Sequence, residues 1–219
     1  MKNPKPKNNY DQFYPFHYPS IRKTKLNRYF KTKEGEFLDV LLTRRSSPEL
    51  QDISLDDITE LLYFSNKIQS ISVDDSGFLS SKRTVPSAGG RHPIDILVSL
   101  PSETTRFLQY YNPIDHSLNE LSIPREIQQS FFAEVNENLS LGDCCLIWFS
   151  IQTKKTQSKY ENAESLYWRD AGALLYCIQI ISNYLGLKSC PLGGLAIKSF
   201  DNLFHTNNLI SGGGILVGK

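Results

Sequence analysis

The sequence predicts an α+β domain in which helices flank a central, mainly antiparallel sheet. Two apolar runs, residues 94–100 and 144–151, have the length and composition of strands. Two shorter runs, 106–111 and 118–123, surround a turn at 112–116 and predict a hairpin, which joins antiparallel strands. Helical segments lie between these strands, and the mixture is typical of an α+β fold.

Residues 1–35 predict a basic N-terminal arm ahead of a single domain that covers residues 36–219. Residues 1–33 contain nine lysines and arginines against one acidic residue, Asp11. Clustered Tyr and Phe side chains in this arm predict that it packs on the surface of the domain. The first residues contain no apolar stretch of the kind found in signal peptides, so we expect a cytoplasmic protein.

Helices are predicted at residues 36–44, 55–67 and 124–138. The second begins with a capping box, because Ser54 is followed three residues later by Asp57. Its leucines and isoleucines recur at helical spacing and predict one buried face.

The segment 171–187 predicts a helix with apolar residues on nearly every face. We expect such a helix to be enclosed on all sides, in the core of a dimer. A loop follows it, made of Pro191, Leu192, Gly193 and Gly194. Its missing side chains let backbone N–H groups approach a flat ligand, so helix and loop together indicate a flavin. Residues 213–218 close the chain as a strand.

Composition excludes several kinds of function. A formal net charge of +1 provides no overall attraction for nucleic acid. No run of about 18 or more uncharged apolar residues exists, so no membrane association is expected. The four cysteines lack paired C-x-x-C spacing, and no metal site is predicted. Cys144 and Cys145 are adjacent on a predicted strand and should point to opposite faces.

The first candidate site is the sequence Arg44-Arg45-Ser46, which follows the helix at 36–44. Two guanidinium groups and a hydroxyl within three residues can bind a phosphate, to which arginine donates paired hydrogen bonds. Arginine pairs are also common on solvated surfaces, so the motif alone leaves both interpretations open.

The second candidate is the loop 86–93, which leads into a predicted strand. Pro86 and Pro93 stiffen its ends, and Gly89 and Gly90 allow close approach of the backbone to another group. Ser87 can donate a hydrogen bond to a carbonyl or nitrogen of a ring. An ordinary surface turn is the alternative.

Lys159 and Tyr160 form the third candidate, in a polar segment after the strand at 144–151. An ammonium and a phenol act as general acid or base when they are shielded from water. If both are solvated loop residues, they carry no chemistry.

The order of these motifs resembles the nitroreductase-like flavoproteins, and within them the SagB-type azoline dehydrogenases of peptide natural-product clusters. The resemblance spans nearly the whole chain. It rests on Phe16-His17 with Thr24-Lys25, Arg44-Arg-Ser46, Pro86-Ser-Ala-Gly-Gly-Arg-His-Pro93, Tyr111-Asn-Pro-Ile-Asp-His-Ser-Leu118, Lys159-Tyr160 and residues 168–194.

The resemblance implies a nitroreductase-like fold, an intertwined homodimer and one FMN per site across the subunit interface. Lys159 and Tyr160 would be catalytic, in the oxidation of a thiazoline or oxazoline ring of a peptide to a thiazole or oxazole. The implied cofactor-binding residues are Arg44, Arg45, Ser46, Pro86, Ser87, Gly89, Pro191, Leu192, Gly193, Gly194 and Lys219.

Two other functions remain open at this stage. One is an NAD(P)H-dependent nitro or quinone reductase on the same fold. The other is a flavin-free interaction subunit of a biosynthetic complex, favoured by Pro48, where a basic residue is usual, and by the short basic end at Lys219. For the dehydrogenase, a cyclodehydratase or a carrier protein is the expected partner besides the peptide substrate.

Overall fold

The computed structural model describes residues 2–30, 37–73, 77–102, 105–137, 139–206 and 208–219. Its strands are β1 (Lys5–Pro6), β2 (Ser20–Lys25), β3 (Ile68–Val73), β4 (Leu79–Arg83), β5 (Ile94–Ser99), β6 (Gln109–Asn112), β7 (Ser117–Leu121), β8 (Cys145–Gln152), β9 (Tyr160–Glu161), β10 (Lys188–Pro191) and β11 (Leu209–Gly218). Its helices are α1 (Phe37–Thr43), α2 (Leu55–Asn66), α3 (Arg125–Asn136), α4 (Thr153–Gln157), α5 (Glu164–Tyr184) and α6 (Ile197–Phe204), with a short 3-10 turn η1 (Ala88–Gly90).

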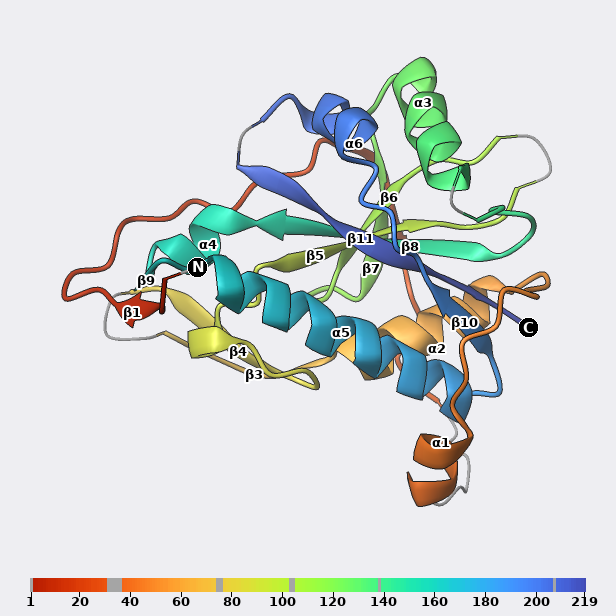
Figure 1. The fold of residues 1–219 in the computed structure, drawn as a ribbon, viewed down its shortest axis with the longest axis horizontal. Coiled ribbons are helices and arrows are strands. Elements are labelled where there is room, and N and C mark those ends of the chain that lie inside the picture. The colour runs from red at the N-terminus through yellow and green to blue at the C-terminus, as the bar shows by residue number, and fades with distance from the viewer. Residues whose placement is uncertain (1, 31–36, 74–76, 103–104, 138, 207) are drawn as a thin grey trace.

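Seven strands form one sheet in the order β10-β11-β8-β5-β6-β7-β2, and all neighbouring pairs in it are antiparallel. Helices α2 and α5 cover one face, and α3 and α6 cover the other (Figure 1). The predicted mixture of helices around a mainly antiparallel sheet is therefore confirmed.

The alternation of side chains along β8 produces a core on each face. Ile147 and Phe149 pack with the core under α2 and α5, whereas Leu146 and Trp148 pack with the core under α3 and α6. All residues of β8 are buried. Cys144 and Cys145 join opposite cores as predicted, and all four cysteines are free thiols.

Helix α2 begins at the predicted capping box. The backbone N–H of Asp57 donates to Ser54 Oγ at 3.1 Å, and the Ser54 N–H donates to Asp57 Oδ2 at 3.2 Å. Leu61 and Leu62 are fully buried. The predicted helices at 36–44 and 124–138 correspond to α1 and α3, although residues 36 and 138 lie outside the described residues.

The N-terminal arm contributes strands as well as packing. Strand β2 pairs with β7 at the edge of the sheet, and β1 pairs with β9. Tyr18 is buried and stacks on Tyr110 with ring centroids 4.5 Å apart. The sequence of β2, SIRKTK, contains almost no apolar residue from which a strand could be predicted. Lysine and arginine suit this strand because it lies at the exposed edge of the sheet. The domain boundary expected at residue 35 lies outside the described residues.

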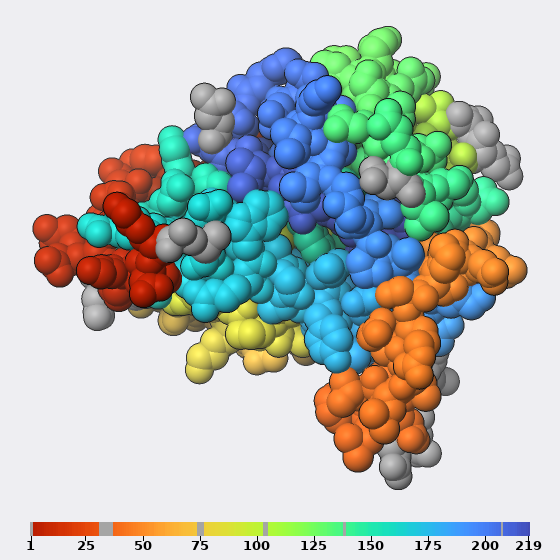
Figure 2. All heavy atoms as spheres, in the orientation of Figure 1, coloured from red at the N-terminus to blue at the C-terminus, as the bar shows by residue number. Residues whose placement is uncertain are grey.

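Helix α5 buries only one face within this chain. Leu174, Ile178 and Ser182 face the sheet at helical spacing, whereas Tyr176 is 49% exposed. The expectation that this helix is enclosed on all sides is therefore not met by one chain. Its outer face runs across the middle of the surface in Figure 2, uncovered by the rest of the chain. None of the described helices is long and apolar enough to cross a membrane.

Candidate functional site

The loop 86–93 is tied to the beginning of α5 by a buried carboxylate. Ser87 Oγ donates to Asp170 Oδ2 at 2.5 Å, and the backbone N–H of Ala88 donates to the same carboxylate at 3.3 Å. The backbone N–H of His92 in turn donates to Ser87 Oγ at 2.8 Å. These bonds hold the loop against the helix through contacts of the chain itself.

Gly89 lies directly against the Lys159–Tyr160 pair. A Cβ atom at this position would come within 2.7 Å of Tyr160 Oη and about 3 Å of the Lys159 side chain. Gly89 also has a positive φ of 62°, a conformation that favours glycine. Only a residue without a side chain allows the pair and the loop to meet here, so the second and third candidate motifs form one group.

The Lys159–Tyr160 pair is held in place by the N-terminal arm. Strand β1 pairs with β9, and the backbone N–H of Lys7 donates to the carbonyl oxygen of Lys159 at 2.9 Å. Lys159 Nζ lies 5.4 Å from the ring centroid of Tyr10, a cation–π distance. Burial raises the pKa of the Tyr160 phenol, so the phenol keeps its proton and acts as a hydrogen-bond donor at neutral pH.

Asp170 was not among the residues singled out from the sequence. It is 9% exposed, and burial raises its pKa while the hydrogen bond from Ser87 opposes the rise. A carboxylate directly before the apolar run that begins at Ala171 is costly to bury without partners. The position of an acidic residue directly before this apolar run was therefore the indication in the sequence that Asp170 has a structural partner.

Ser46 lies beside β10. Ser46 and Ser189 form an isolated bridge, and the backbone N–H of Ser47 donates to the carbonyl oxygen of Ser189 at 3.0 Å. Gln179 of α5 donates from Nε2 to Ser46 Oγ at 3.3 Å. Because Pro191 ends the same strand, this bridge brings the first candidate motif close to the loop at 191–194.

The three basic side chains proposed for this region differ in their contacts. Arg45 Nη1 donates to the carbonyl oxygens of Leu42 and Arg44, and Lys219 Nζ pairs with Asp57 at 3.1 Å. The half-buried Arg44 guanidinium forms no hydrogen bond or ion pair with any described residue. Of the three, Arg44 is therefore the one available to an anion.

The loop at 191–194 presents an open glycine. The backbone N–H of Leu192 donates to the carbonyl oxygen of Gly214 at 2.9 Å, and the Leu192 side chain packs against the core under α3 and α6. Gly193 is exposed, and a Cβ there would meet no atom within 4 Å. Space for a ligand therefore adjoins Gly193, whereas Leu192 serves packing.

The candidate residues thus fall into two clusters at different positions along α5, one at Asp170 and the other at Gln179. The loop cluster consists of Ser87, Gly89, Lys159, Tyr160 and Asp170. The Arg44 cluster consists of Arg44, Ser46, Gln179, Ser189 and residues 191–194. The rise of α5 between Asp170 and Gln179 is about 13 Å, so the two clusters are separate within one chain.

Solved structures with the same architecture belong to nitroreductase-like proteins, although no family model and no curated protein matches the chain. A candidate nitroreductase of Ralstonia eutropha has a TM-score of 0.71 and 19% identity, over 96% of this chain and 97% of that one. A chain of the E. coli microcin synthetase McbBCD complex, solved with truncated pro-MccB17 bound, has a TM-score of 0.63 and 17% identity, over 88% and 76%. A candidate nitroreductase of Desulfovibrio desulfuricans, solved with FMN, has a TM-score of 0.52 and 14% identity, over 85% and 87%. The predicted nitroreductase-like fold is confirmed.

Proposed function

We propose that this chain is an FMN-dependent dehydrogenase that oxidises a thiazoline or oxazoline ring of a peptide to a thiazole or oxazole. The observation that carries the proposal is the loop cluster, where Lys159 and Tyr160 meet Gly89 on a nitroreductase-like fold. The likeness to a chain of the McbBCD complex supports a role in peptide modification.

The Arg44 cluster fits the requirements of FMN. Arg44 offers a guanidinium without another partner among the described residues, and Ser46 offers a hydroxyl, a combination suited to the phosphate. The open backbone at Gly193 suits a flat ring. Arg45 and Lys219 are less suited, because both are engaged elsewhere.

The separation of the two clusters favours a site shared between two chains. In a symmetric dimer, antiparallel packing of the two α5 helices would bring the beginning of one helix to the end of the other. The partly exposed apolar face of α5 suits this contact, and Leu175 and Ile181 are only half-buried in one chain. We therefore propose a homodimer in which each flavin contacts the Arg44 cluster of one subunit and the loop cluster of the other.

The residues of the loop cluster supply the proton chemistry. Aromatisation removes two hydrogens and two electrons from the ring, one hydrogen as a proton and the other as a hydride. When bound, FMN supplies the hydride acceptor. Lys159 Nζ, acting in its unprotonated amine form, takes the proton from the ring carbon and becomes an ammonium. The protonated Tyr160 phenol donates a hydrogen bond to the ring nitrogen, which makes that carbon more acidic.

The cofactor proposal is tested by purifying the full chain and recording its visible absorbance. We expect a yellow protein that releases FMN on denaturation. A colourless protein that also fails to take up added FMN would contradict the proposal and favour the flavin-free interaction subunit.

The shared site is tested by mixing two defective variants, Arg44→Ala and Lys159→Ala. Random exchange of subunits would restore one intact site in each mixed dimer, or about a quarter of the wild-type activity. No recovery after demonstrated subunit exchange would show that both clusters act within one chain.

The second candidate function is an NAD(P)H-dependent nitro or quinone reductase, which the likeness to candidate nitroreductases supports. Consumption of NAD(P)H with nitroaromatics or quinones, without oxidation of azoline peptides, would establish it in place of the dehydrogenase. A cyclodehydratase or carrier protein is the partner we propose for the dehydrogenase, and co-purification with a neighbouring gene product tests it.

A further inference from the structure

A cavity of about 380 Å³ lies under the N-terminal arm and outside both clusters. Its volume is within the range of small-molecule sites. Its walls are mainly apolar and come from the arm, from the β3–β4 hairpin and from the β6–β7 turn. They include Phe13, Phe16, Ile71, Phe78, Leu79 and Tyr110.

Three charged side chains line the same cavity. Arg83, at the end of β4, donates to Ser81 Oγ at 3.1 Å and to Asn66 Oδ1 at 3.2 Å. Lys155 of α4 donates to the carbonyl oxygen of His92 at 3.0 Å. Asp95 of β5 accepts a hydrogen bond from Gln152, which also accepts one from the backbone N–H of Phe16.

The two cations in this cavity have only neutral hydrogen-bond partners. No ion pair joins Asp95 to Arg83 or to Lys155, all three of which the structure describes. With one carboxylate against two cations, the lining carries a net positive charge inside apolar walls. Partly buried positive charge of this kind is stabilised by an anion that also fills the apolar space.

We propose that this cavity binds a small carboxylate with a flat apolar body, with the carboxylate on Lys155 and Arg83 and the ring between the aromatic walls. The charge favours an anion over a cation or a neutral ring. The aromatic residues in the lining of the cavity favour a planar body.

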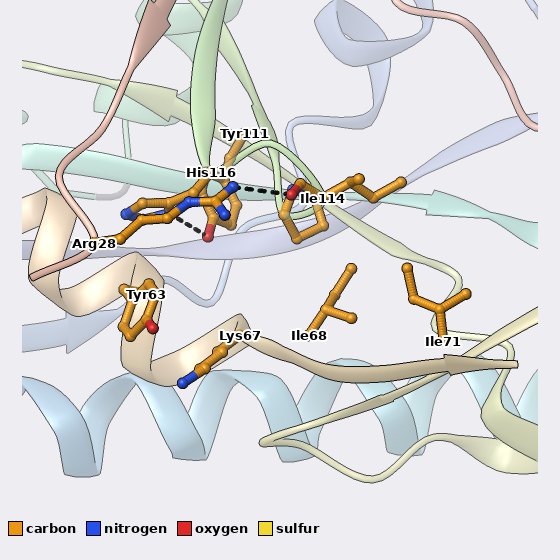
Figure 3. A pocket seen from close by; sticks show the side chains of 9 residues that line it. Arg28, Tyr63, Lys67, Ile68, Ile71, Tyr111, Ile114 and His116 are labelled. Carbon is orange, nitrogen blue, oxygen red and sulfur yellow. Dashed lines mark hydrogen bonds between the residues drawn. The ribbon is translucent and has the colours of Figure 1, made fainter.

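The apolar part of the cavity adjoins a smaller pocket of about 160 Å³. Ile68, Ile71 and Ile114 line both spaces, and Figure 3 shows Ile68 and Ile71 projecting from β3 toward Ile114. Arg28, which lines the smaller pocket, donates a hydrogen bond to the carbonyl oxygen of Ile114 at 3.0 Å.

The cavity is distinct from the candidate catalytic pair. A Cβ atom at Gly90 would lie next to Ser80 and Ser81, which line the cavity, whereas a Cβ atom at Gly89 would meet Lys159 and Tyr160. The proposal therefore does not depend on the azoline activity and stands whether or not the chain proves to be a dehydrogenase.

Titration calorimetry of the full, FMN-saturated protein with benzoate tests the proposal, with benzylamine as the cationic comparison. We expect benzoate to bind and benzylamine not to bind. Lys155→Gln keeps a donor for the His92 carbonyl but removes the charge, and should weaken benzoate by about 10- to 100-fold. Lys154→Gln, which changes the exposed neighbouring lysine of α4, should leave the affinity unchanged.

The pH dependence gives a second measurement. Burial lowers the pKa of Lys155 to about 8, with Arg83 and Arg91 acting in the same direction and Asp95 opposing them. Benzoate affinity should therefore fall as pH rises through 8 in the wild type, but not in Lys155→Gln. Loss of binding in Lys159→Gln with full binding in Lys155→Gln would place benzoate at the catalytic pair and overturn the proposal, as would the absence of any benzoate binding.

Discussion

The two clusters along α5 differ in how complete they are within one chain. In the loop cluster the polar groups already bind one another, with Ser87 on Asp170 and Gly89 against Tyr160. In the Arg44 cluster the guanidinium of Arg44 has no partner among the described residues, and Gly193 faces open space. The loop cluster is therefore preorganised by its own contacts, whereas the Arg44 cluster keeps groups that can bind a ligand.

This difference separates two tasks that a flavoenzyme must perform. Proton transfer requires groups that are held within hydrogen-bond reach of the substrate, which internal bonds provide. Cofactor binding requires donors that are not already engaged, which the Arg44 cluster provides. Changes in the first cluster should therefore alter chemistry and stability, and changes in the second should alter affinity for FMN.

The largest expected effect is on the rate of substrate oxidation. Tyr160→Phe and Lys159→Ala should each retain FMN but slow flavin reduction by an azoline peptide by about 10²–10⁴-fold, the usual contribution of a positioned proton-transfer group. Anaerobic stopped-flow absorbance measures this rate, and Lys154→Ala, on the exposed side of α4, is the control. Wild-type rates in both variants would leave the proposed mechanism without its acid–base groups.

The pH profile sharpens the role of Tyr160. Burial raises the pKa of this phenol above its ordinary value of 10.0, so it remains protonated throughout the neutral range. The wild-type rate should therefore show no decrease from loss of this proton up to about pH 10. A rate that rises with pH near 7, with a rise that Tyr160→Phe abolishes, would show that the phenol ionises and serves as the base.

The next effect is on stability, through Asp170. Asp170→Ala leaves Ser87 Oγ and the N–H of Ala88 without their acceptor and should lower the free energy of unfolding by about 2–3 kcal/mol. Chemical denaturation measures this change. Asp170→Asn keeps one acceptor oxygen and should lower the free energy of unfolding by less than Asp170→Ala does.

The carboxylate also gives wild-type stability a pH dependence. Because burial raises the pKa of Asp170 in the folded state, stability should fall as pH rises from 3.8, the ordinary pKa, through the raised value. Asp170→Asn should lack this part of the decrease. An Asp170→Ala variant as stable as the wild type would show that the loop cluster is not held together by this residue.

A substitution in the Arg44 cluster should instead lower the affinity for FMN. Arg44→Ala should weaken FMN binding by about 1.5–3 kcal/mol if a charge-assisted contact to the phosphate is lost. Arg45→Ala is the matched control, because Arg45 already donates to backbone carbonyls. Equal FMN affinity in Arg44→Ala and the wild type, measured by fluorescence titration, would remove Arg44 from the site.

The smallest expected effect contrasts two glycines. Gly89→Ala forces a positive φ on alanine and places its Cβ on Tyr160, so it should cost about 1–2 kcal/mol of stability. Gly193→Ala meets no atom and should change stability by less than about 0.5 kcal/mol. Thermal unfolding of both variants tests the contrast, which would fail if both variants lost the same stability.

The sequence predicts the principal elements of the fold because their signals are local. The capping box at Ser54 and the apolar runs that become β5 and β8 are examples. Strand β2 was missed because its charged residues suit an exposed edge, and α5 could not be assigned a buried and an open face because its apolar residues surround it.

The candidate site was predicted motif by motif, but its division into two clusters was not. The contact between Gly89 and Tyr160 joins residues far apart in the chain, and no spacing rule reveals it. The engagement of Lys219 by Asp57 and of Arg45 by backbone carbonyls depends equally on the folded structure. Long-range contacts therefore decide which of the predicted residues remain free to bind a ligand.

The most direct test of the proposed activity is a single anaerobic turnover of the FMN-loaded wild-type protein with a thiazoline-containing peptide. We predict that the flavin absorbance bleaches while the peptide loses two hydrogens by mass spectrometry, with one thiazole formed per FMN reduced. An unchanged peptide and an oxidised flavin, in a sample whose flavin NAD(P)H reduces readily, would contradict the dehydrogenase and establish the reductase instead.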